Sequence, residues 1–572
     1  MLGGLEISEI MLSGIQSHTK SFRTDAEFFK KEYLNQDKAI AKNGFDKLVN
    51  LTTKINVGFV GQMVEHYQNE GIALLQTKNI DAFFINDNNL IKITEKFHKQ
   101  LAKSQIKKKD ILIARSGSFG KASIYLEDIT INTSDIIIVE ANALKINPYF
   151  LVSYLNSKFG VGQMIRFSSG GLQGHVNLTI LEELEVPKII HIFQEKIEKI
   201  IVDAYKKRQD SQNLYTLAEQ ILLFEIGLLG NHSAGYTEEN LGDWVSDDPS
   251  EQMLANVEPG PREEFELLRT EFEQIMAEQD RLKAIVDYDG EIAHWTKNRD
   301  YLQELADEIA KKQTQLKFIE NNRNLYHLEM ASSKNTNIKS FSESFGTTGR
   351  LDAEYYQQKY EQVIERIISQ KHDLLKNMVE ISKSIEPGSS HYSEDTGLPF
   401  YRVSDFNKFG LSKPSKELTD AFVNDNKALI EKIKPKRGTI FFSKDGSVGT
   451  AYLLREDLDG ITSGAILHLK VKNTKEIIPA YLTLALNSKL VQMQAERDAG
   501  GSIILHWRKE EIEQVVVPVI DYKLQEKIAT LIEESFQLKS ESEGLLAVAK
   551  RAVEIAIEED EAAAMRYIAA NK

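Results

Sequence analysis

Apolar positions along the chain follow two kinds of spacing, and the same succession of spacings occurs twice. Short apolar runs beside glycine-bearing turns predict strands at residues 71–76, 110–115, 397–402 and 439–443. Helical spacing then predicts a long helix from His191 to Gly227 and a second one from Leu524 to Ile557. The pattern therefore predicts two similar units, each with a β-rich module that is followed by a long helix.

Short motifs recur in the same order in both predicted units. The pairs are Arg23–Phe29 with Arg350–Tyr356, Gly117–Gly120 with Gly446–Gly449, Leu155–Lys158 with Leu486–Lys489, Gly170–Gly171 with Gly500–Gly501, Val186–Pro187 with Val517–Pro518, and Gln194–Ile197 with Gln525–Ile528. Because these separate matches keep one order, we infer that the chain contains an internal duplication.

An acidic segment separates the two units. Residues 231–330 contain 23 Asp and Glu against 10 Lys and Arg, a local charge of 10 − 23 = −13. Apolar residues keep heptad spacing on both sides of a turn at Tyr288–Gly290, so we predict an inserted helical hairpin at 233–337. We interpret this insert as a docking element for a partner protein. A solvated coiled-coil decoration and a DNA-like decoy surface are the alternatives.

Composition limits the class of protein. A chain of 572 residues is too long for one compact core, so we expect several domains. The absence of cysteine excludes disulfides, thiolate metal sites and a cysteine nucleophile, and it fits a reducing cytoplasm. Met1–Gln16 lacks the pattern of a signal peptide, and no apolar stretch approaches the roughly 18 residues of a membrane span. We therefore expect a cytoplasmic protein.

The repeated motifs resemble those of the specificity subunits of type I restriction-modification complexes. The resemblance rests on the Asp-Ala-Glu-aromatic motif, the Gly-Ser-x-Gly turn, the Leu-Asn-Ser-Lys helix and the Val-Pro step before a long helix, and it covers residues 5–230 and 338–560. It implies an α+β chain with two β-rich target-recognition domains, related by pseudo-twofold symmetry and joined by long antiparallel helices. The acidic insert departs from the family pattern, in which the units usually follow one another after a short connection.

The resemblance also implies a division of the chain into domains. These are a first target-recognition domain with its N-terminal segment (1–190), a central helical spacer (191–232), the inserted acidic hairpin (233–337), a second target-recognition domain (338–520) and a C-terminal helical spacer (521–572).

Reading of a bipartite duplex DNA target is the function that the resemblance implies, with one target-recognition domain for each half. A helix of roughly 37 residues, at about 1.5 Å each, limits the separation of the halves to about 55 Å, or about 16 base pairs. The chain is expected to be non-catalytic and to bind no cofactor. Two methyltransferase subunits are expected to carry S-adenosylmethionine and to recruit endonuclease subunits, and no membrane partner is expected.

Three loops in each module carry the side chains that we expect to contact DNA. Gln76 and Arg402 stand at equivalent strand ends, and their side chains suit bidentate contacts to adenine and guanine, respectively. The glycine-bearing turns at 115–121 and 443–449 let backbone amides approach a phosphate or a base edge. A third pair of polar loops covers 166–177 and 497–508. Solvated strand ends and tight hairpin turns are the purely structural alternatives.

The complete candidate set is Gln76, Lys78, Asn79, Arg115, Ser116, Ser118, Lys121, Arg166, Gln173, His175 and Asn177 in the first module, and Arg402, Ser404, Asp405, Lys444, Ser447, Ser502, His506, Trp507 and Arg508 in the second.

Other kinds of site have less support in the sequence. His175 and His506 have no second ligand at metal-binding spacing, so we expect no metal. The glycine-bearing turns lack the spacing of a nucleotide-binding P-loop. Asn147–Phe150 resembles the Asn-Pro-Pro-aromatic tetrapeptide of amino-methyltransferases but lacks its second proline, and we predict a helix start there instead.

Two rival functions remain open at this point. A fused enzyme with its own methyltransferase or nuclease activity would need an intact cofactor loop and catalytic tetrapeptide, or a carboxylate-lysine cluster, and we find neither. A coiled-coil adaptor that binds only protein would leave both sets of polar loops without a purpose. The segment 46–188 has 16 basic and 14 acidic residues, so we expect the lone chain to bind DNA weakly and to share phosphate contacts with its partners.

Overall fold

The computed structural model divides the chain into two compact units. It describes residues 9–11, 13, 15, 23–61, 63–68, 70–87, 90–115, 120–168, 176–228, 342, 344, 349–393, 397–500 and 505–571. Unit 1 comprises Met1–Gln212 and Gln537–Lys572, and unit 2 comprises Asn213–Phe536. The C-terminal end of the chain therefore completes the N-terminal unit. The predicted hairpin at 233–337 lies outside the described residues.

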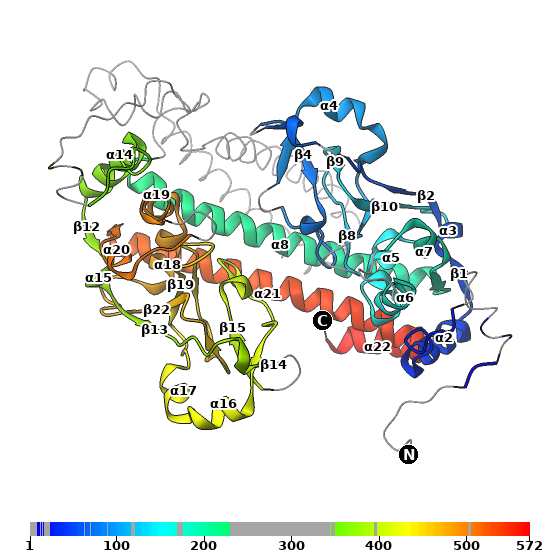
Figure 1. Cartoon of the computed structure of the whole chain (residues 1–572). Helices are drawn as coiled ribbons and strands as arrows, with labels where there is room; N and C mark the ends of the chain where they lie inside the picture. The colour runs from blue at the N-terminus through cyan, green and yellow to red at the C-terminus, as the bar shows by residue number, and fades with distance from the viewer. Residues whose placement is uncertain are drawn as a thin grey trace, which may run out of the picture. The chain divides into compact units, whose positions relative to one another are not determined.

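Unit 1 contains a four-stranded sheet of order β2-β10-β7-β8 and a five-stranded sheet of order β3-β5-β4-β9-β6, together with the pair β1-β11 (Figure 1). The strands are β1 (Phe45–Lys47), β2 (Thr52–Val57), β3 (Tyr67–Gln68), β4 (Ile72–Leu75), β5 (Ile91–Ile93), β6 (Gln105–Ile106), β7 (Ile111–Ala114), β8 (Ala122–Ile124), β9 (Ile131–Thr133), β10 (Ile136–Ala141) and β11 (Glu185–Pro187). Strands β4 and β9 run parallel, so their C-terminal ends meet at one edge of the sheet.

Short helices connect and cover these sheets. They are α2 (Lys31–Lys42), α3 (Leu48–Leu51), α4 (Glu95–Gln100), α5 (Pro148–Leu155), α6 (Lys158–Ser168), α7 (Leu178–Glu183) and α22 (Glu561–Ala570), with the 3-10 turns η1 (Val64–His66), η2 (Thr77–Asn79) and η3 (Ala102–Ser104). Helix α5 begins at Pro148, and the Asn147 side chain accepts a hydrogen bond from the amide of Tyr149 at 2.9 Å. The predicted helix start at this tetrapeptide is therefore confirmed.

Strand β7 and the first four residues of β10 in the four-stranded sheet of unit 1 are buried on both faces, which explains why they are continuous apolar runs. Along β7, Ile111 and Ile113 belong to the core that α5 and the long helices share. The alternate residues Leu112 and Ala114 belong to a second core with Leu75 of the five-stranded sheet. This alternation follows from the two-residue period of a strand.

Unit 2 repeats this arrangement with the order β13-β22-β19-β20, beside the sheet β14-β18-β15-β21 and the pairs β12-β23 and β16-β17. The strands are β12 (His372–Leu374), β13 (Val379–Lys383), β14 (Tyr392–Ser393), β15 (Leu398–Tyr401), β16 (Phe406–Asn407), β17 (Gly410–Leu411), β18 (Glu417–Leu418), β19 (Ile440–Ser443), β20 (Ala451–Leu453), β21 (Ile461–Thr462), β22 (Ile466–Val471) and β23 (Val516–Pro518). Its β15 and β21 are parallel, as β4 and β9 are in unit 1.

The helices of unit 2 are α14 (Gln358–Ile368), α15 (Leu375–Met378), α16 (Asp420–Asp425), α17 (Lys427–Ile433), α18 (Pro479–Asn487), α19 (Lys489–Asp498) and α20 (Lys509–Ile512), with η4 (Ser389–His391) and η5 (Val403–Asp405). The shared strand orders confirm the predicted duplication and the mixed α and β character of the fold.

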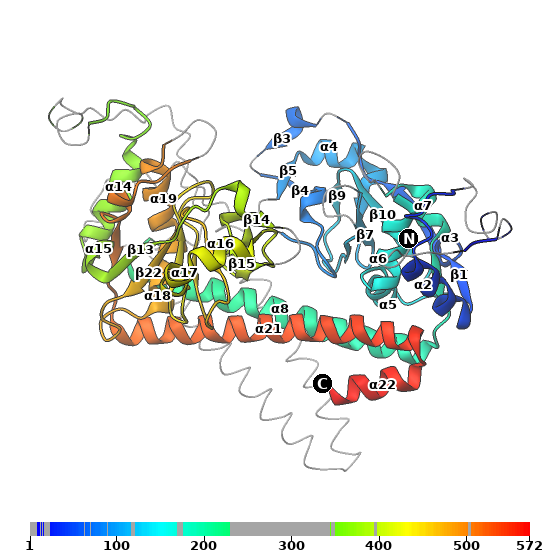
Figure 2. The same ribbon diagram turned by 60° about the horizontal axis from the view of Figure 1, so that its bottom comes forward.

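Two long helices, α8 (His191–Glu225) and α21 (Tyr522–Glu558), contribute residues to both units. Within unit 1 they lie side by side (Figure 2), and the Ser542 hydroxyl donates to the carbonyl of Ala204 at 2.6 Å. Within unit 2, Leu222 of α8 and Ile532 of α21 belong to one core. The structure confirms both predicted long helices. Over the residues that the structure describes, none of the helices is long and apolar enough to span a bilayer.

Side-chain amides from the repeated motifs hold the backbone in both units. In the Leu-Asn-Ser-Lys motif, Asn156 donates to the carbonyl of Ala122 at 2.7 Å and accepts from its amide at 3.2 Å. Asn487 makes the same pair of bonds with Ala451, at 2.8 and 2.9 Å. The motif therefore attaches the end of a helix to an edge strand of the central sheet.

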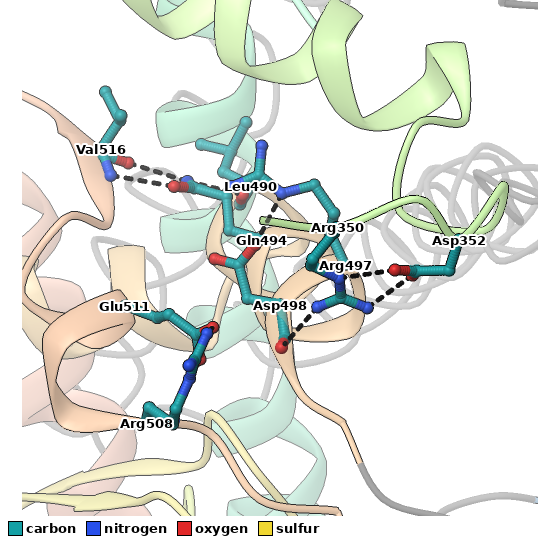
Figure 3. Close-up of polar contacts among 9 residues, drawn as sticks. All are labelled: Arg350, Asp352, Leu490, Gln494, Arg497, Asp498, Arg508, Glu511 and Val516. Atoms are coloured by element: carbon teal, nitrogen blue, oxygen red, sulfur yellow. Dashed lines mark hydrogen bonds and ion pairs between the residues drawn. The ribbon is translucent and has the colours of Figure 1, made fainter. Parts of the chain in front are cut away.

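A second amide, from Gln163 in unit 1 and Gln494 in unit 2, holds the strand before each long helix. Figure 3 shows Gln494, which donates to the carbonyl of Val516 and accepts from its amide, both at 2.9 Å. Gln163 bonds the backbone of Glu185 in the same way, at 3.0 and 2.9 Å.

The Arg-x-Asp-Ala-Glu-aromatic motif docks on the end of a helix in each unit. Arg350 pairs with Asp352, and its guanidinium donates to the carbonyl of Asp498 at the end of α19 (Figure 3). The hydrogen bond from Arg350 lowers the pKa of Asp352, whereas burial raises the pKa of Asp498. In unit 1, Arg23 pairs with Asp25 in the same way and donates to the carbonyls of Arg166 and Phe167 at the end of α6. The motifs that reveal the duplication therefore act mainly in folding.

Candidate nucleic-acid interface

Unit 1 brings its three candidate loops together at the edge where β4 and β9 end. The carbonyl of Leu75, directly before Gln76, accepts from the amide of Ser134 at 2.8 Å. Asp135 follows, and its carboxylate pairs with Arg115 at 2.8 Å, beyond the end of β7. The carbonyl of Arg115 accepts from the amide of Val176 at 3.2 Å, which brings in the third loop.

Unit 2 builds the same convergence from its own residues. The carbonyl of Tyr401, before Arg402, accepts from the amide of Ser463 at 2.8 Å. Two residues later, the carbonyl of Ala465 accepts from the amide of Lys444 at 2.9 Å, and the carbonyl of Lys444 accepts from Trp507 at 2.7 Å. The strand register aligns Ala114 with Ser443, so Lys444 occupies the position of Arg115.

The glycines of the two turns have the conformation that their position requires. Gly120 has φ of 79° and Gly449 has φ of 81°, which are values in the left-handed region that most side chains avoid. The hairpin bonds beside them also match, because the amide of Ala114 donates to Lys121 at 3.1 Å and that of Ser443 to Thr450 at 2.9 Å. In unit 2 the Gly446–Gly449 motif therefore forms a tight turn next to Lys444, and in unit 1 Gly120 is the described residue of the corresponding motif.

Gln76 and Arg402 each precede a 3-10 turn that is closed by a side chain three residues later. Asn79 accepts from the amide of Gln76 at 2.9 Å, and Asp405 accepts from the amide of Arg402 at 2.8 Å. The Arg402 guanidinium donates to Ser415 at 2.6 Å and keeps 40% of its side-chain surface exposed. The predicted equivalence of these two strand ends is confirmed in local structure, with an amide at one and a guanidinium at the other.

Four candidates lie in the interior. Asn79 is 1% exposed, Asp405 5%, Arg166 2% and Trp507 1%. Arg166 pairs with both carboxylate oxygens of Asp37, at 2.9 and 2.7 Å. Asn79 and Asp405 hold the 3-10 turns, Arg166 joins α6 to α2, and the Trp507 ring packs against Phe442. Their burial keeps all four side chains from a DNA surface.

Other candidates lie at the surface. Lys78, Asn177, Ser404, Ser447, His506 and Arg508 are exposed, and Gln76, Arg115, Lys121, Arg402 and Lys444 are partly exposed. Asn177 also caps α7 by accepting from the amide of Ile180 at 2.9 Å. The hydrogen bond with Glu511 raises the pKa of Arg508, which therefore stays charged. Ser116, Ser118, Gln173, His175 and Ser502 lie outside the described residues.

Carboxylates beside the candidate cations are the residues that sequence reasoning missed. Asp135 pairs with Arg115, Asp81 with Lys121 at 2.5 Å, and Asp445 with Lys444 at 2.5 Å. Asp445 also accepts from His506 at 2.8 Å. Asp81 and Asp135 are distant from their partners in the sequence, and only Asp445, beside Lys444, carried a local signal. Among the described residues there is no cluster of three or more His, Asp or Glu that would hold a metal.

The structure thus defines a class of protein with two copies of one mixed α and β module, each with a polar convergence of three loops beside a long helix. The family model described as "Type I restriction modification DNA specificity domain" matches residues 27–223 and 374–546. The chain belongs to this family of DNA specificity domains, and it contains two copies.

Two of the solved structures that match over most of the chain are described as specificity subunits. The S subunit of a type I restriction-modification system from M. genitalium is 12% identical, with coverage of 90% of this chain and 94% of that chain and a TM-score of 0.32. The HsdS subunit from Thermoanaerobacter tengcongensis is 11% identical, with coverage of 90% and 96% and a TM-score of 0.23. The family assignment rests on the sequence match and not on these likenesses. A comparison with curated proteins finds no match.

Proposed function

We propose that this chain is the specificity subunit of a type I restriction-modification complex and that each unit reads one half of a bipartite duplex target. The observation that carries the proposal is the repeated three-loop convergence with different side chains. The backbone bonds that join Arg115 to Val176 also join Lys444 to Trp507. At the matching strand ends the side chains are Gln76 and Arg402, which suit contacts to different bases.

Recognition of two different half-sites requires two units with the same backbone arrangement and different side chains at the positions that contact bases. Glutamine suits a bidentate contact to adenine, and arginine suits one to guanine, and each such contact discriminates by about 1–3 kcal/mol. Exposed lysines and serines around the loops would then contact phosphates and fix the register.

The chemistry is assigned to partner subunits in this proposal. Two methyltransferase subunits would bind the chain and carry S-adenosylmethionine, and endonuclease subunits would join through them. The chain itself would act without a cofactor. Because Arg115, Lys121 and Lys444 are paired with carboxylates, DNA must compete for these three cations, which supports weak binding by the lone chain.

Detection of methylated adenines by long-read sequencing tests the proposed function. We expect deletion of the gene from its source genome to remove methylation at one bipartite sequence and its reintroduction to restore it. Reintroduction of Arg402→Ala should relax the sequence in one half only, because Arg402 belongs to one unit. An unchanged methylation pattern after deletion would refute the proposal.

A further inference from the structure

In each unit, a cation directly follows one strand of the four-stranded sheet, Arg115 after β7 and Lys444 after β19. A carboxylate of the same unit pairs with each of these cations. Arg115 Nη1 lies 2.8 Å from Asp135 Oδ1, with 33% and 42% of the two side chains exposed. Lys444 Nζ lies 2.5 Å from Asp445 Oδ2, and the other oxygen of Asp445 accepts from His506 at 2.8 Å. Both pairs reach solvent, so both are accessible to DNA.

The two carboxylates do not occupy corresponding positions of the repeat. Asp135 lies between Ser134 and Ile136, and the matching segment of unit 2, between Ser463 and Ile466, is Gly464–Ala465. Asp445 follows Lys444 directly, and the residue after Arg115 is Ser116. The two units therefore reach the same cation–carboxylate arrangement from different places, so the shared fold alone does not account for it.

Asp135 is held in an uncommon backbone conformation. Its φ of 52° lies in the left-handed region, which residues with a Cβ atom seldom adopt. The surrounding loops maintain it, because its carbonyl accepts from the Thr77 hydroxyl at 3.2 Å and its amide donates to Phe59 at 3.2 Å. The carboxylate therefore has a fixed place between the strand end at Gln76 and the turn at Arg115.

A carboxylate at this position changes what DNA the cation binds. An unpaired guanidinium or ammonium attracts the phosphates of every sequence alike. A paired cation has its charge compensated by the carboxylate and attracts phosphates less, whereas the N–H donors that the carboxylate leaves free can still bond the O6 and N7 atoms of guanine. The carboxylate also limits the orientation of the cation before DNA arrives.

We propose that Asp135 and Asp445 are specificity-determining residues, each of which positions the cation of its unit and withholds it from sequence-independent phosphate contacts. The inference rests on the proposed function and assigns to it two residues that lie outside the set predicted from sequence. It requires that loss of the carboxylate strengthens binding to unselected DNA while it weakens discrimination, a combination that a purely structural role does not produce.

Asp135→Asn is the informative substitution, because asparagine tolerates the left-handed conformation and removes only the charge. The full-length chain is incubated at low ionic strength with a library of random duplexes, and the retained duplexes are sequenced. We expect Asp135→Asn to retain roughly threefold more unselected DNA and to lose about five- to tenfold of the discrimination in one half-site. The other half-site should be unchanged.

Asp445→Asn should have the reciprocal effect on the other half-site. Asp135→Gly keeps the backbone conformation and should behave like Asp135→Asn. The matched control is Asp128→Asn, which removes a carboxylate of unit 1 that pairs with Lys108 at 2.8 Å on an exposed surface with 84% of Asp128 accessible. This control should change neither quantity.

Weaker binding of Asp135→Asn and Asp445→Asn to all DNA, with lower unfolding temperatures, would overturn the proposal in favour of a structural role. Unchanged discrimination in both variants would overturn it as well. If Asp135→Asn does not fold, Asp445→Asn decides alone. The wild-type arm tests the function separately, because a wild-type chain that enriches no sequence contradicts DNA recognition itself.

Discussion

His468 shows how a single buried side chain makes one unit sensitive to pH. It lies in β22 with 7% exposure, and its Nε2 is 2.8 Å from the Thr462 hydroxyl. Burial lowers the pKa of His468 from about 6.5 to about 4. His468 is therefore protonated in the unfolded chain below about pH 6.5, whereas in the folded chain it stays neutral until about pH 4.

We predict that the free energy of unfolding of unit 2 falls as the pH drops from about 6.5 to about 4, by up to about 3 kcal/mol from this group. The strand register aligns His468 with Ile138 of unit 1, so His468→Ile is a natural replacement and should flatten this part of the pH profile. Chemical denaturation at several pH values measures the effect. The exposed His372→Gln serves as control, and an equally steep profile in His468→Ile would contradict the assignment.

The sequence predicted an exposed position correctly for some candidate side chains and wrongly for others. Residue type and loop position single out Gln76, Arg402 and Lys444, which are at least partly exposed in the structure. The same criteria also select Arg166 and Trp507, because an arginine or a tryptophan in a polar loop looks alike whether it faces DNA or the core. Which candidates touch bases remains a prediction.

At the scale of elements, the repeated polar motifs hold helices to strands. Asn156 supplies both a donor and an acceptor to Ala122, which is fully buried. Without the Asn156 side chain, the backbone amide of Ala122 loses its partner in a place that water does not reach, at a cost of about 1–3 kcal/mol. The carbonyl of Ala122 still accepts from the amide of Phe83 at 2.8 Å.

We therefore predict that Asn156→Ala lowers the free energy of unfolding of unit 1 by about 1–3 kcal/mol. Asn487→Ala should do the same in unit 2. Urea denaturation measures the stability, and hydrogen exchange at β8 measures the local effect. Asn50→Ala, at an exposed position, is the control and should stay within about 0.5 kcal/mol of the wild type. If Asn156→Ala were as stable as Asn50→Ala, the hydrogen bonds between Asn156 and Ala122 would not contribute to the stability of unit 1.

Elements were the most predictable level of this protein. The predicted strands at 71–76, 110–115, 397–402 and 439–443 appear as β4, β7, β15 and β19, and the two predicted long helices appear as α8 and α21. The apolar residues of these segments keep a regular spacing over many residues or in both units, because each element buries its apolar side chains in a core. The parallel pairing of β4 with β9 was not predictable, because it joins segments that are separated by a helix and several strands.

At the scale of the whole molecule, the acidic insert lies between the two segments that match the family model, 27–223 and 374–546. Its role as a docking element remains a prediction that rests on its charge and heptad spacing. We predict that replacement of residues 236–335 by a short linker reduces the recruitment of methyltransferase or endonuclease subunits and leaves the recognised sequence unchanged.

Copurification of the partner subunits with the shortened chain measures recruitment, and methylation sequencing measures recognition. A shortened chain that recruits its partners as well as the full chain does would remove the docking interpretation. A gain in DNA binding after deletion would support the decoy interpretation instead.

The sequence alone determined that the chain is built twice from one plan, because local apolar periods and repeated motifs are properties of short segments. It also determined the family, since those motifs keep their order. Only the tertiary structure decided which polar side chains are buried and which carboxylate faces which cation. Asp135 meets Arg115, and Asp81 meets Lys121, through contacts between segments distant in the sequence, and no local pattern encodes such a meeting.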